Sequence, residues 1–208
     1  MTEASLVFVV DDDPSVRSSL KFLLSTVGLQ AETFDSADSF LCRKPADIPS
    51  CLVLDVRLPG LSGLDFQREL ATRNICIPIV FLTGHGDIPM SVRAMKAGAV
   101  EFLTKPFRDQ ELLDAVRVAL DRDRARRKHD KEVADLRQRF DSLTSREQEV
   151  VSMVVAGMLN KQIAAELGTA ESTVKVQRSR AMEKMQAASL AELIKMIEKV
   201  KAPWEKAS

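Results

Sequence analysis

The sequence predicts an α/β fold: a doubly wound (βα)5 domain, then a long helical linker and an all-α domain of four helices. Short apolar runs alternate with helically periodic runs over the first 122 residues, which is typical of a parallel sheet between two helical layers. Neither Gly nor Pro occurs from Phe107 to Ala156, which favours unbroken helix. Short helices ended by Gly157 and Gly168 follow. The expected parts are residues 1–122, a linker at 123–142 and a helical domain at 143–208.

Five short apolar runs are the expected strands of the sheet. The central run leads into Asp55, and Pro59 and Gly60 break the chain soon after it. A continuous apolar run bounded by turn residues is typical of a strand buried on both faces. The runs cover residues 6–10, 31–34, 52–54, 79–82 and 100–103.

The expected helices of this part fill the intervals between the strands. Pro14 suits the first turn of a helix, and Asp13 before it is a candidate N-cap. Apolar residues then recur at helical spacing until Gly28 ends the run. Further helices are expected at 36–44, 63–73, 88–97 and from 109 onward.

Residues with reactive or charged side chains follow four of the strands. Because the carboxyl ends of parallel strands meet at one edge of a sheet, we expect Asp11, Asp12, Asp55, Thr83 and Lys105 to converge there. Neighbouring carboxylates repel one another unless a cation offsets their charge, and oxygen ligands of this kind suit Mg²⁺. An ammonium group at this rim could neutralise the carboxylates, hold a phosphoryl oxygen, or do both. For Asp13, a helix cap and membership of the acidic cluster remain open.

Four motifs in this order resemble the two-component receiver domain, and in particular its FixJ group. The resemblance covers residues 6–122 and implies a five-stranded α/β receiver fold. The motifs are Val10-Asp11-Asp12-Asp13, Leu54-Asp55 with Pro59-Gly60, the stretch from Phe81 to Gly86, and the stretch from Ala99 to Phe107.

The resemblance implies that Asp55 is the nucleophile that takes a phosphoryl group from a sensor histidine kinase. Asp11 and Asp12 would hold Mg²⁺ together with Asp55, and the backbone carbonyl of Arg57 would complete the protein ligands. General chemistry agrees, because phosphoryl transfer depends on positioning and charge neutralisation, and an ionised carboxylate is already a nucleophile.

By the same resemblance, Thr83 and Lys105 bind the phosphoryl oxygens and Phe102 is a switch aromatic. Thr83 would move toward the phosphoryl group, and Phe102 would turn inward and reshape the face built by the helices at 88–97 and from 109. Such an element has two packed states that a local charge can bias. The alternative for Phe102 is a plain core residue of the last strand.

Beyond residue 120 an almost wholly charged stretch, 121–132, separates two apolar stripes. The stripes do not share one heptad register, so a continuous coiled coil is not expected. We favour a helical extension of about 30 residues, about 45 Å long at 1.5 Å per residue. The alternative is a solvated, partly disordered charged linker.

The last part has the pattern of a helix-turn-helix. Thr144 and Glu147 form a capping-box pattern ahead of an apolar run, and Asn160 is the expected N-cap of a helix at 161–167. A turn after Gly168 leads to a helix at 171–185, and a final helix is expected at 189–200. Two short helices joined by a Gly-containing turn are typical of DNA-binding helix-turn-helix domains.

The helix at 171–185 has one apolar face, with Val174, Ala181 and Met185, and an opposite face of polar and basic side chains. Such a face suits a DNA major groove, where outward residues meet base edges and Arg or Lys meet phosphates. A helical bundle with a solvated basic face is the alternative.

The motifs Leu143-Thr144-Ser145-Arg146-Glu147, Asn160 to Ala164 and Ser172 to Val176 resemble the LuxR-type output domain of the NarL/FixJ class, over residues 143–200. One departure is Ala170, which stands where a capping Ser or Thr is common, so that the helix start is frayed or capped by Thr169. The resemblance implies base-reading positions at Lys175, Val176 and Ser179, and phosphate contacts at Lys161, Thr173, Arg178 and Lys184.

Charge and cysteine content agree with a regulator of this kind. Residues 1–122 carry 13 Lys or Arg and 17 Asp or Glu, so the remaining residues carry 17 and 13, respectively. An acidic part joined to a basic part suggests that only the second meets a polyanion. Three cysteines without ligand spacing, no apolar run long enough for a bilayer and no signal-peptide pattern predict a cytoplasmic protein without a membrane partner.

We therefore expect a two-component response regulator, and a transcriptional activator, whose phosphorylation on Asp55 promotes homodimer formation. The expected partners are a sensor histidine kinase, double-stranded DNA with a two-fold operator, and RNA polymerase. Its only chemistry would be its own phosphoryl transfer and dephosphorylation. One alternative is a phosphorylation-independent regulator whose first domain only dimerises. The other is a Mg²⁺-dependent phosphatase, disfavoured because such enzymes carry an Asp-x-Asp nucleophile after the first strand, whereas Asp55 follows the third.

Overall fold

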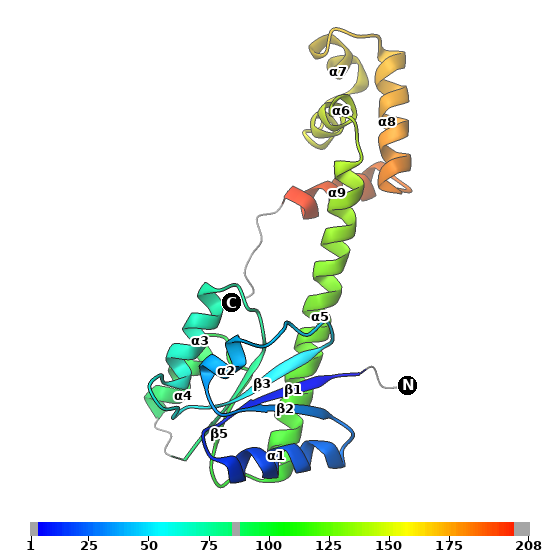
Figure 1. The fold of residues 1–208 in the computed structure, drawn as a ribbon. Helices are drawn as coiled ribbons and strands as arrows, with labels where there is room; N and C mark the ends of the chain where they lie inside the picture. The colour runs from blue at the N-terminus through cyan, green and yellow to red at the C-terminus, as the bar shows by residue number, and fades with distance from the viewer. Residues whose placement is uncertain (1–3, 85–87, 202–208) are drawn as a thin grey trace. The chain divides into compact units, whose positions relative to one another are not determined.

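The computed structural model of the chain describes residues 4–84 and 88–201 (Figure 1). Five parallel strands form one sheet in the order β2-β1-β3-β4-β5. The strands are β1 (Leu6–Val10), β2 (Gln30–Phe34), β3 (Ser50–Asp55), β4 (Ile79–Thr83) and β5 (Glu101–Thr104). The expected doubly wound sheet is confirmed, and β5 begins one residue later than the sequence predicted.

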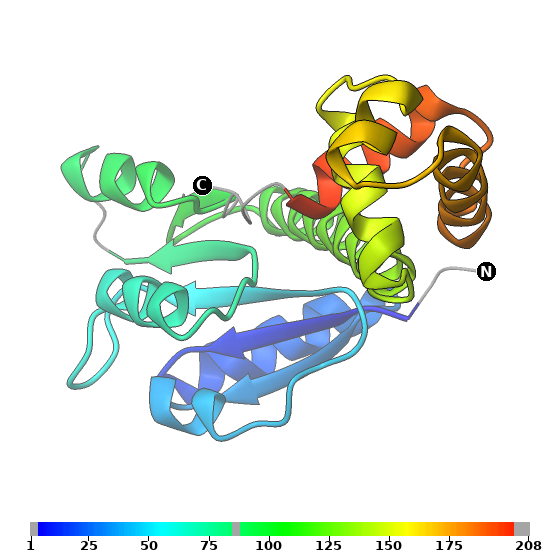
Figure 2. The same cartoon turned by 90° about the horizontal axis from the view of Figure 1, so that it is seen from above.

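Two layers of helices cover the sheet because side chains of each strand alternate between its faces. Val7, Val9 and Val53 pack against α1 (Pro14–Thr26) and α5 (Asp109–Asp141). Phe8 and Leu54 on the opposite face pack against α2 (Ala37–Leu41), α3 (Gly63–Thr72) and α4 (Ile88–Lys96). Figures 1 and 2 show these two layers.

Helix α2 is shorter than the predicted 36–44 and ends at Leu41. The Arg43 guanidinium folds back over the core aromatics, 4.0 Å from the centre of the Phe8 ring and 4.2 Å from that of Phe40. Pro45 also disfavours the helical conformation at the residue before it. A cation over an aromatic face is stabilised by the ring quadrupole, so Arg43 packs on the Phe8 and Phe40 rings instead of extending α2.

Helix α5 is one unbroken helix of 33 residues, which confirms the helical linker over the disordered alternative. The chain divides into two compact units, the first ending at Arg127 and the second beginning at Lys128, both within α5. The domain boundaries at 122 and 143 that the sequence suggests stay predictions.

The second unit consists of the end of α5 and the helices α6 (Ser145–Val155), α7 (Asn160–Glu166), α8 (Glu171–Met185) and α9 (Leu190–Lys201). Its core joins Leu143 and Val151 to Ala181, Met185 and Leu193. The inward face predicted for α8 is confirmed, because Val174, Ala181 and Met185 are buried.

The N-termini of these helices differ in their caps. The capping box of Thr144 and Glu147 is confirmed. The predicted Asn160 cap is wrong: Leu159 occupies the cap position, its N–H donates to Gln162 Oε1 at 2.8 Å, and Asn160 is the first helical residue. Ala170 is the N-cap residue of α8 and has no side-chain hydrogen bond, so Thr169 does not take over that role.

None of the helices in the described ranges combines the length and hydropathy that a membrane span requires.

Candidate functional site

The register of the sheet brings the strand-end residues to one edge. Val10 pairs with Leu54, and Asp55 pairs with Leu82 on β4. Thr83 at the end of β4 pairs with Thr104, and its carbonyl accepts the Lys105 N–H at 2.6 Å. Residues far apart in sequence therefore meet at the carboxyl edge, as expected for parallel strands.

Three carboxylates form the centre of this edge. Asp11, Asp12 and Asp55 each offer a carboxylate oxygen, and these atoms all lie within 4.8 Å of one another. Asp11 is 1% exposed and Asp55 7%, whereas Asp12 is exposed and leaves the cluster open to solvent on its side. An oxygen-only set with an open side fits Mg²⁺, which keeps several water ligands.

Asp13 is separate from this acidic cluster. Its Oδ1 accepts the Ser15 N–H at 2.7 Å and caps α1, which settles the two alternatives in favour of the cap.

Lys105 supplies the positive charge of the site. Its Nζ lies 2.7 Å from Asp11 Oδ2 and 3.4 Å from Asp55 Oδ1. Burial alone would lower the pKa of Lys105, but the hydrogen bond to Asp11 and the charges of both carboxylates outweigh it and raise that pKa. Burial raises the pKa of Asp55, Lys105 opposes this shift, and the Asp11 charge adds to it. The site thus holds three carboxylates and one ammonium group. The negative charge that remains favours the binding of a further cation.

Two residues that the sequence did not single out shape this edge. Arg17 Nη1 donates to the Asp11 carbonyl at 2.7 Å and fixes the backbone after β1. Gly63 opens α3 against the end of β3, where an added Cβ would lie 2.5 Å from the Asp55 carbonyl oxygen. The sequence has one signal for this close approach of α3 to β3: Gly63 is the first residue of a helix after the turn at Pro59 and Gly60.

Two further predicted site residues, Arg57 and Phe102, lie in the loop after β3 and on β5. Arg57 is exposed in the loop after β3 and forms an isolated antiparallel bridge with Ser62. The half-buried Phe102 ring packs on Phe81, with ring centres 6.1 Å apart. This contact is compatible with both a core role and a switch role. His85 and Gly86, which complete one of the receiver-like motifs, lie outside the described residues.

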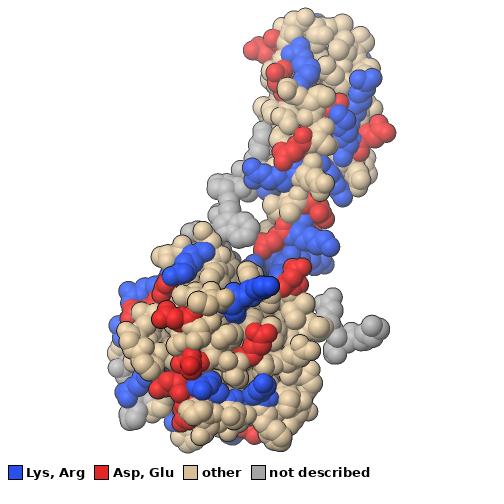
Figure 3. All heavy atoms as spheres, in the orientation of Figure 1, with Lys and Arg blue, Asp and Glu red and all other residues tan. Residues whose placement is uncertain are grey.

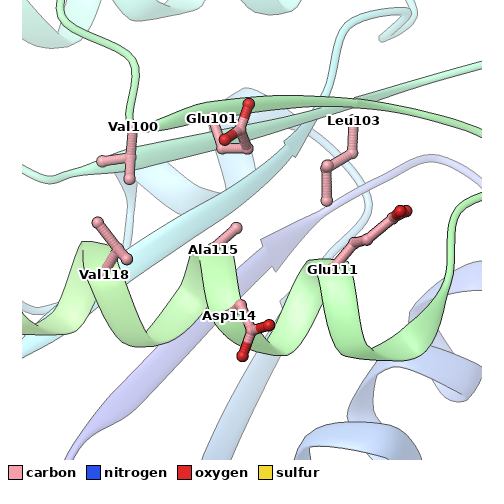
Figure 4. Close-up of a pocket in the computed structure, with 7 residues that line it drawn as sticks. All are labelled: Val100, Glu101, Leu103, Glu111, Asp114, Ala115 and Val118. Atoms are coloured by element: carbon pink, nitrogen blue, oxygen red, sulfur yellow. The ribbon is translucent and has the colours of Figure 1, made fainter.

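A groove with a volume of about 460 Å³ lies between β5 and α5 (Figure 4). Both apolar and acidic side chains line its walls. They are Val100, Leu103, Ala115 and Val118, with Glu101, Glu111 and Asp114. We call the surface formed by α4, β5 and α5 of the first unit the α4–β5–α5 side, and the groove is the part of it between β5 and α5.

The second unit presents α8 with an exposed polar and basic side. Thr173, Lys175, Val176 and Ser179 are exposed there, and Lys161 is exposed on α7. Figure 3 shows Lys and Arg spheres gathered over the α8 side of this unit. The geometry matches a recognition helix that enters a major groove.

Two of the predicted phosphate-contacting residues already have protein partners. Arg178 is half-buried, and its Nη1 donates to Asn160 Oδ1 at 3.3 Å. Lys184 Nζ lies 2.6 Å from Oε2 of Glu147, a capping-box residue that is only 4% exposed. Their side chains hold α8 in place within the unit, in addition to any contact with DNA.

The Lys184–Glu147 pair makes the stability of the second unit depend on pH. The hydrogen bond from Lys184 lowers the pKa of Glu147, so the stabilisation is complete above the unfolded-state pKa and is lost as pH falls through the lower folded-state pKa. Lys184→Gln is expected to raise hydrogen exchange at α6 amides about fivefold at pH 7, since the pair is part-exposed and contributes about 1 kcal/mol. The difference from wild type should vanish below the folded-state pKa of Glu147.

The matched control for this prediction is Arg180→Gln, because Arg180 is exposed on the same helix. It should exchange like wild type at both ends of the pH range. Equal exchange in the Lys184 variant and the control at pH 7 would refute a stabilising role for the pair.

Comparisons with known proteins identify both units. The model of the response regulator receiver domain matches residues 7–117, and that of the luxR family of bacterial regulatory proteins matches residues 141–197. Nodulation protein W of Bradyrhizobium diazoefficiens is 60% identical over 95% of this chain and 88% of its own length. The transcriptional regulatory protein FixJ of Azorhizobium caulinodans is 43% identical over 94% of this chain and 93% of its own length.

The solved structure of the response regulator StyR is similar over both units. It is 52% identical, with a TM-score of 0.83, and the match covers 94% of this chain and 99% of StyR. The chain belongs to the two-component response regulators in which a receiver domain is joined to a LuxR-type DNA-binding domain.

Proposed function

We propose that Asp55 accepts a phosphoryl group from a sensor histidine kinase in a Mg²⁺-dependent transfer, and that this switches DNA binding through dimerisation. The observation that carries the proposal is the position of the Lys105 ammonium, 3.4 Å from the Asp55 carboxylate and beside the oxygens of Asp11 and Asp12. A nucleophile, a cation and a set of metal-type oxygens at one solvent-open edge are what phosphoryl transfer needs.

The chain's own residues have distinct roles in this step. An Asp55 carboxylate oxygen attacks the phosphorus, the bond between phosphorus and the kinase imidazole nitrogen breaks with its electron pair going to nitrogen, and an acyl phosphate forms. Lys105 and Thr83 hold the phosphoryl oxygens. Asp11, Asp12, Asp55 and the Arg57 carbonyl would hold Mg²⁺, which when bound neutralises phosphoryl charge.

The α4–β5–α5 side is the surface through which we propose that phosphorylation acts. Thr83 and Phe102 lie on β4 and β5 at the edge of this side, and Phe102 contacts the core through Phe81. Exposed apolar residues gather on its helices: Ile88, Val92 and Met95 on α4 and Val118 on α5. A shift of Phe102 would change how this apolar side meets a second copy of the chain.

On the DNA side, a dimer would place two copies of α8 on a two-fold operator. Lys175, Val176 and Ser179 are the proposed base-reading residues. Lys161, Thr173, Arg178 and Lys184 are the proposed phosphate contacts, and activation would proceed through RNA polymerase. Because Lys and Arg would contact DNA phosphates and release counterions, we expect the affinity for DNA to fall as the salt concentration rises.

The proposal is tested with the full chain, Mg²⁺ and acetyl phosphate as donor. A duplex enriched from a random library by the treated wild type serves as the DNA probe. Treatment should convert monomer to dimer in sedimentation and tighten duplex binding at least about tenfold in fluorescence anisotropy, the range of ordinary allosteric coupling. Asp55→Asn should show neither change. Dimers and tight binding without treatment would favour the phosphorylation-independent alternative.

The dimer surface itself gives a separate prediction. Val92→Asp places a charge in the exposed apolar patch of α4, so phosphorylated protein is expected to stay monomeric at concentrations where wild type is dimeric. Phe22→Asp is the matched control, because Phe22 is also an exposed apolar residue but lies on α1. Both variants should take up phosphate from acetyl phosphate as wild type does, and a dimeric Val92 variant would move the interface elsewhere.

A further inference from the structure

A buried carboxylate on α5 has no part in the function proposed above. Among the described residues, four carboxylates are buried: Asp11, Asp55, Glu147 and Asp123. The first two belong to the phosphoryl site and Glu147 to the capping box. Asp123 is 1% exposed and lies in the charged stretch for which the sequence left a solvated linker as the alternative to a helix.

Both oxygens of Asp123 are fully engaged. Oδ2 accepts the backbone N–H of Ser50 at 2.9 Å and Arg127 Nε at 2.7 Å. Oδ1 accepts Arg126 Nε at 3.1 Å. Hydrogen bonds that involve ionised groups are about twice as strong as neutral ones, and here they replace the water that burial removes.

Arg127 and the neighbouring Arg124 extend these contacts to other segments of the first unit. Arg127 Nη2 donates to the Ala46 carbonyl at 2.8 Å, in the segment that leads into β3. Arg124 Nη2 donates to Ser5 Oγ at 2.7 Å, directly before β1. Asp123, Arg126 and Arg127, which we call the α5 latch, therefore tie the helix to the start of β3 and to the segment before it. Arg124, outside the latch, adds a contact before β1.

The position of the latch links it to the phosphoryl site. Ser50 begins β3 and Asp55 ends it, so one six-residue strand carries the latch at one end and the acceptor at the other. The apolar stripe of α5 on the sheet ends at Leu120, and Asp123 continues the same face one turn later. Beyond the latch, α5 runs on without a break to Asp141, within the second unit.

We propose that the α5 latch fixes the rotation of α5 relative to β3. Phosphorylation then changes DNA binding only while the hydrogen bonds of the latch are formed. Asp123 is then a positioning residue for signal transmission. An apolar residue at this position could bury itself in several rotational settings, whereas a carboxylate with three directional donors specifies one. This inference rests on the proposed function, because it concerns how the signal from Asp55 leaves the first unit.

The test compares Asp123→Asn and Arg127→Gln with wild type in the full chain. Asp135→Asn is the matched control, since Asp135 is an exposed carboxylate on the same helix beyond the latch. The readouts are phosphate uptake from acetyl phosphate by intact mass, and the ratio of duplex affinities with and without phosphorylation. The third readout is hydrogen exchange of the α5 amides from 124 to 138.

Both latch variants should take up phosphate as wild type does, because the latch lies at the opposite end of β3 from Asp55. The phosphorylation-dependent gain in duplex affinity should fall at least about fivefold in Asp123→Asn, less in Arg127→Gln, and not in the control. A merely stabilising role would lower the melting temperature and leave this ratio unchanged, and an unchanged ratio overturns the proposal.

Failure of the proposed function has a different signature. If wild type takes up no phosphate, the function fails, and the latch is judged on exchange alone: Asp123→Asn should raise exchange at 124–138 about tenfold over the control. Equal exchange would then overturn it. If wild type takes up phosphate without any gain in affinity, no signal is transmitted and the latch proposal falls as well.

Discussion

Lys105→Met is expected to slow phosphorylation of Asp55 by acetyl phosphate about 100-fold, the cost of removing one preorganised donor to a developing negative charge. The ammonium lies 3.4 Å from the acceptor oxygen, and no other cation of the described residues is ion-paired to Asp55. The time course of the mass increase measures the rate. The slow rate should persist at saturating Mg²⁺, because a metal ion cannot supply the directional hydrogen bond.

The same substitution should tighten Mg²⁺ binding about tenfold, since a fixed positive charge a few ångströms from the acidic cluster opposes a second cation. Calorimetric titration with Mg²⁺ measures this, and Lys21→Met, an exposed lysine on α1, is the control. Slower phosphorylation together with weaker Mg²⁺ binding would show that Lys105 only maintains the shape of the site.

Gly63→Ala is expected to lower the free energy of unfolding of the first unit by about 3 kcal/mol, at the upper end for overpacking. The new Cβ would lie 2.5 Å from the Asp55 carbonyl oxygen and 3.0 Å from Val56 Cα, and neither backbone atom can rotate away. Because relief of the clash moves the end of β3, phosphate uptake by the folded fraction should also fall.

Gly84→Ala is the matched control for this prediction. Gly84 follows β4 at the same edge of the sheet, and an added Cβ there has no atom within 4 Å. Urea unfolding should place the control near wild type, with the Gly63 variant well below both. Equal midpoints for the two variants would mean that β3 and α3 separate more readily than their packing indicates.

The convergence of Asp11, Asp12, Asp55 and Lys105 was predictable because it follows from sheet geometry alone. Each residue comes after a short apolar run, and parallel strands bring such positions to one edge regardless of loop detail. The helical periodicity of α5 and the inward face of α8 were predictable for the same reason: a regular backbone repeats its contacts at fixed spacing.

The parts that the sequence did not predict depend on partners distant in the chain. Asp123 lies in a charged stretch, and its burial requires the Ser50 N–H, 73 residues away. Its three-residue spacing from Leu120 continues the apolar stripe and is the signal that could have marked it. The Asn160 cap failed for a local and a distant reason: Gln162 accepts the Leu159 N–H three residues away, while Asn160 accepts from Arg178 on α8.

The most direct test of a phosphoryl acceptor at Asp55 is the intact mass of the full chain after incubation with Mg²⁺ and acetyl phosphate. Wild type is expected to gain about 80 Da, the mass of one phosphoryl group. Asp55→Asn should gain nothing, and wild type without Mg²⁺ should gain far less. An equal gain in the Asp55 variant, or none in wild type with either acetyl phosphate or a sensor kinase, would contradict the account.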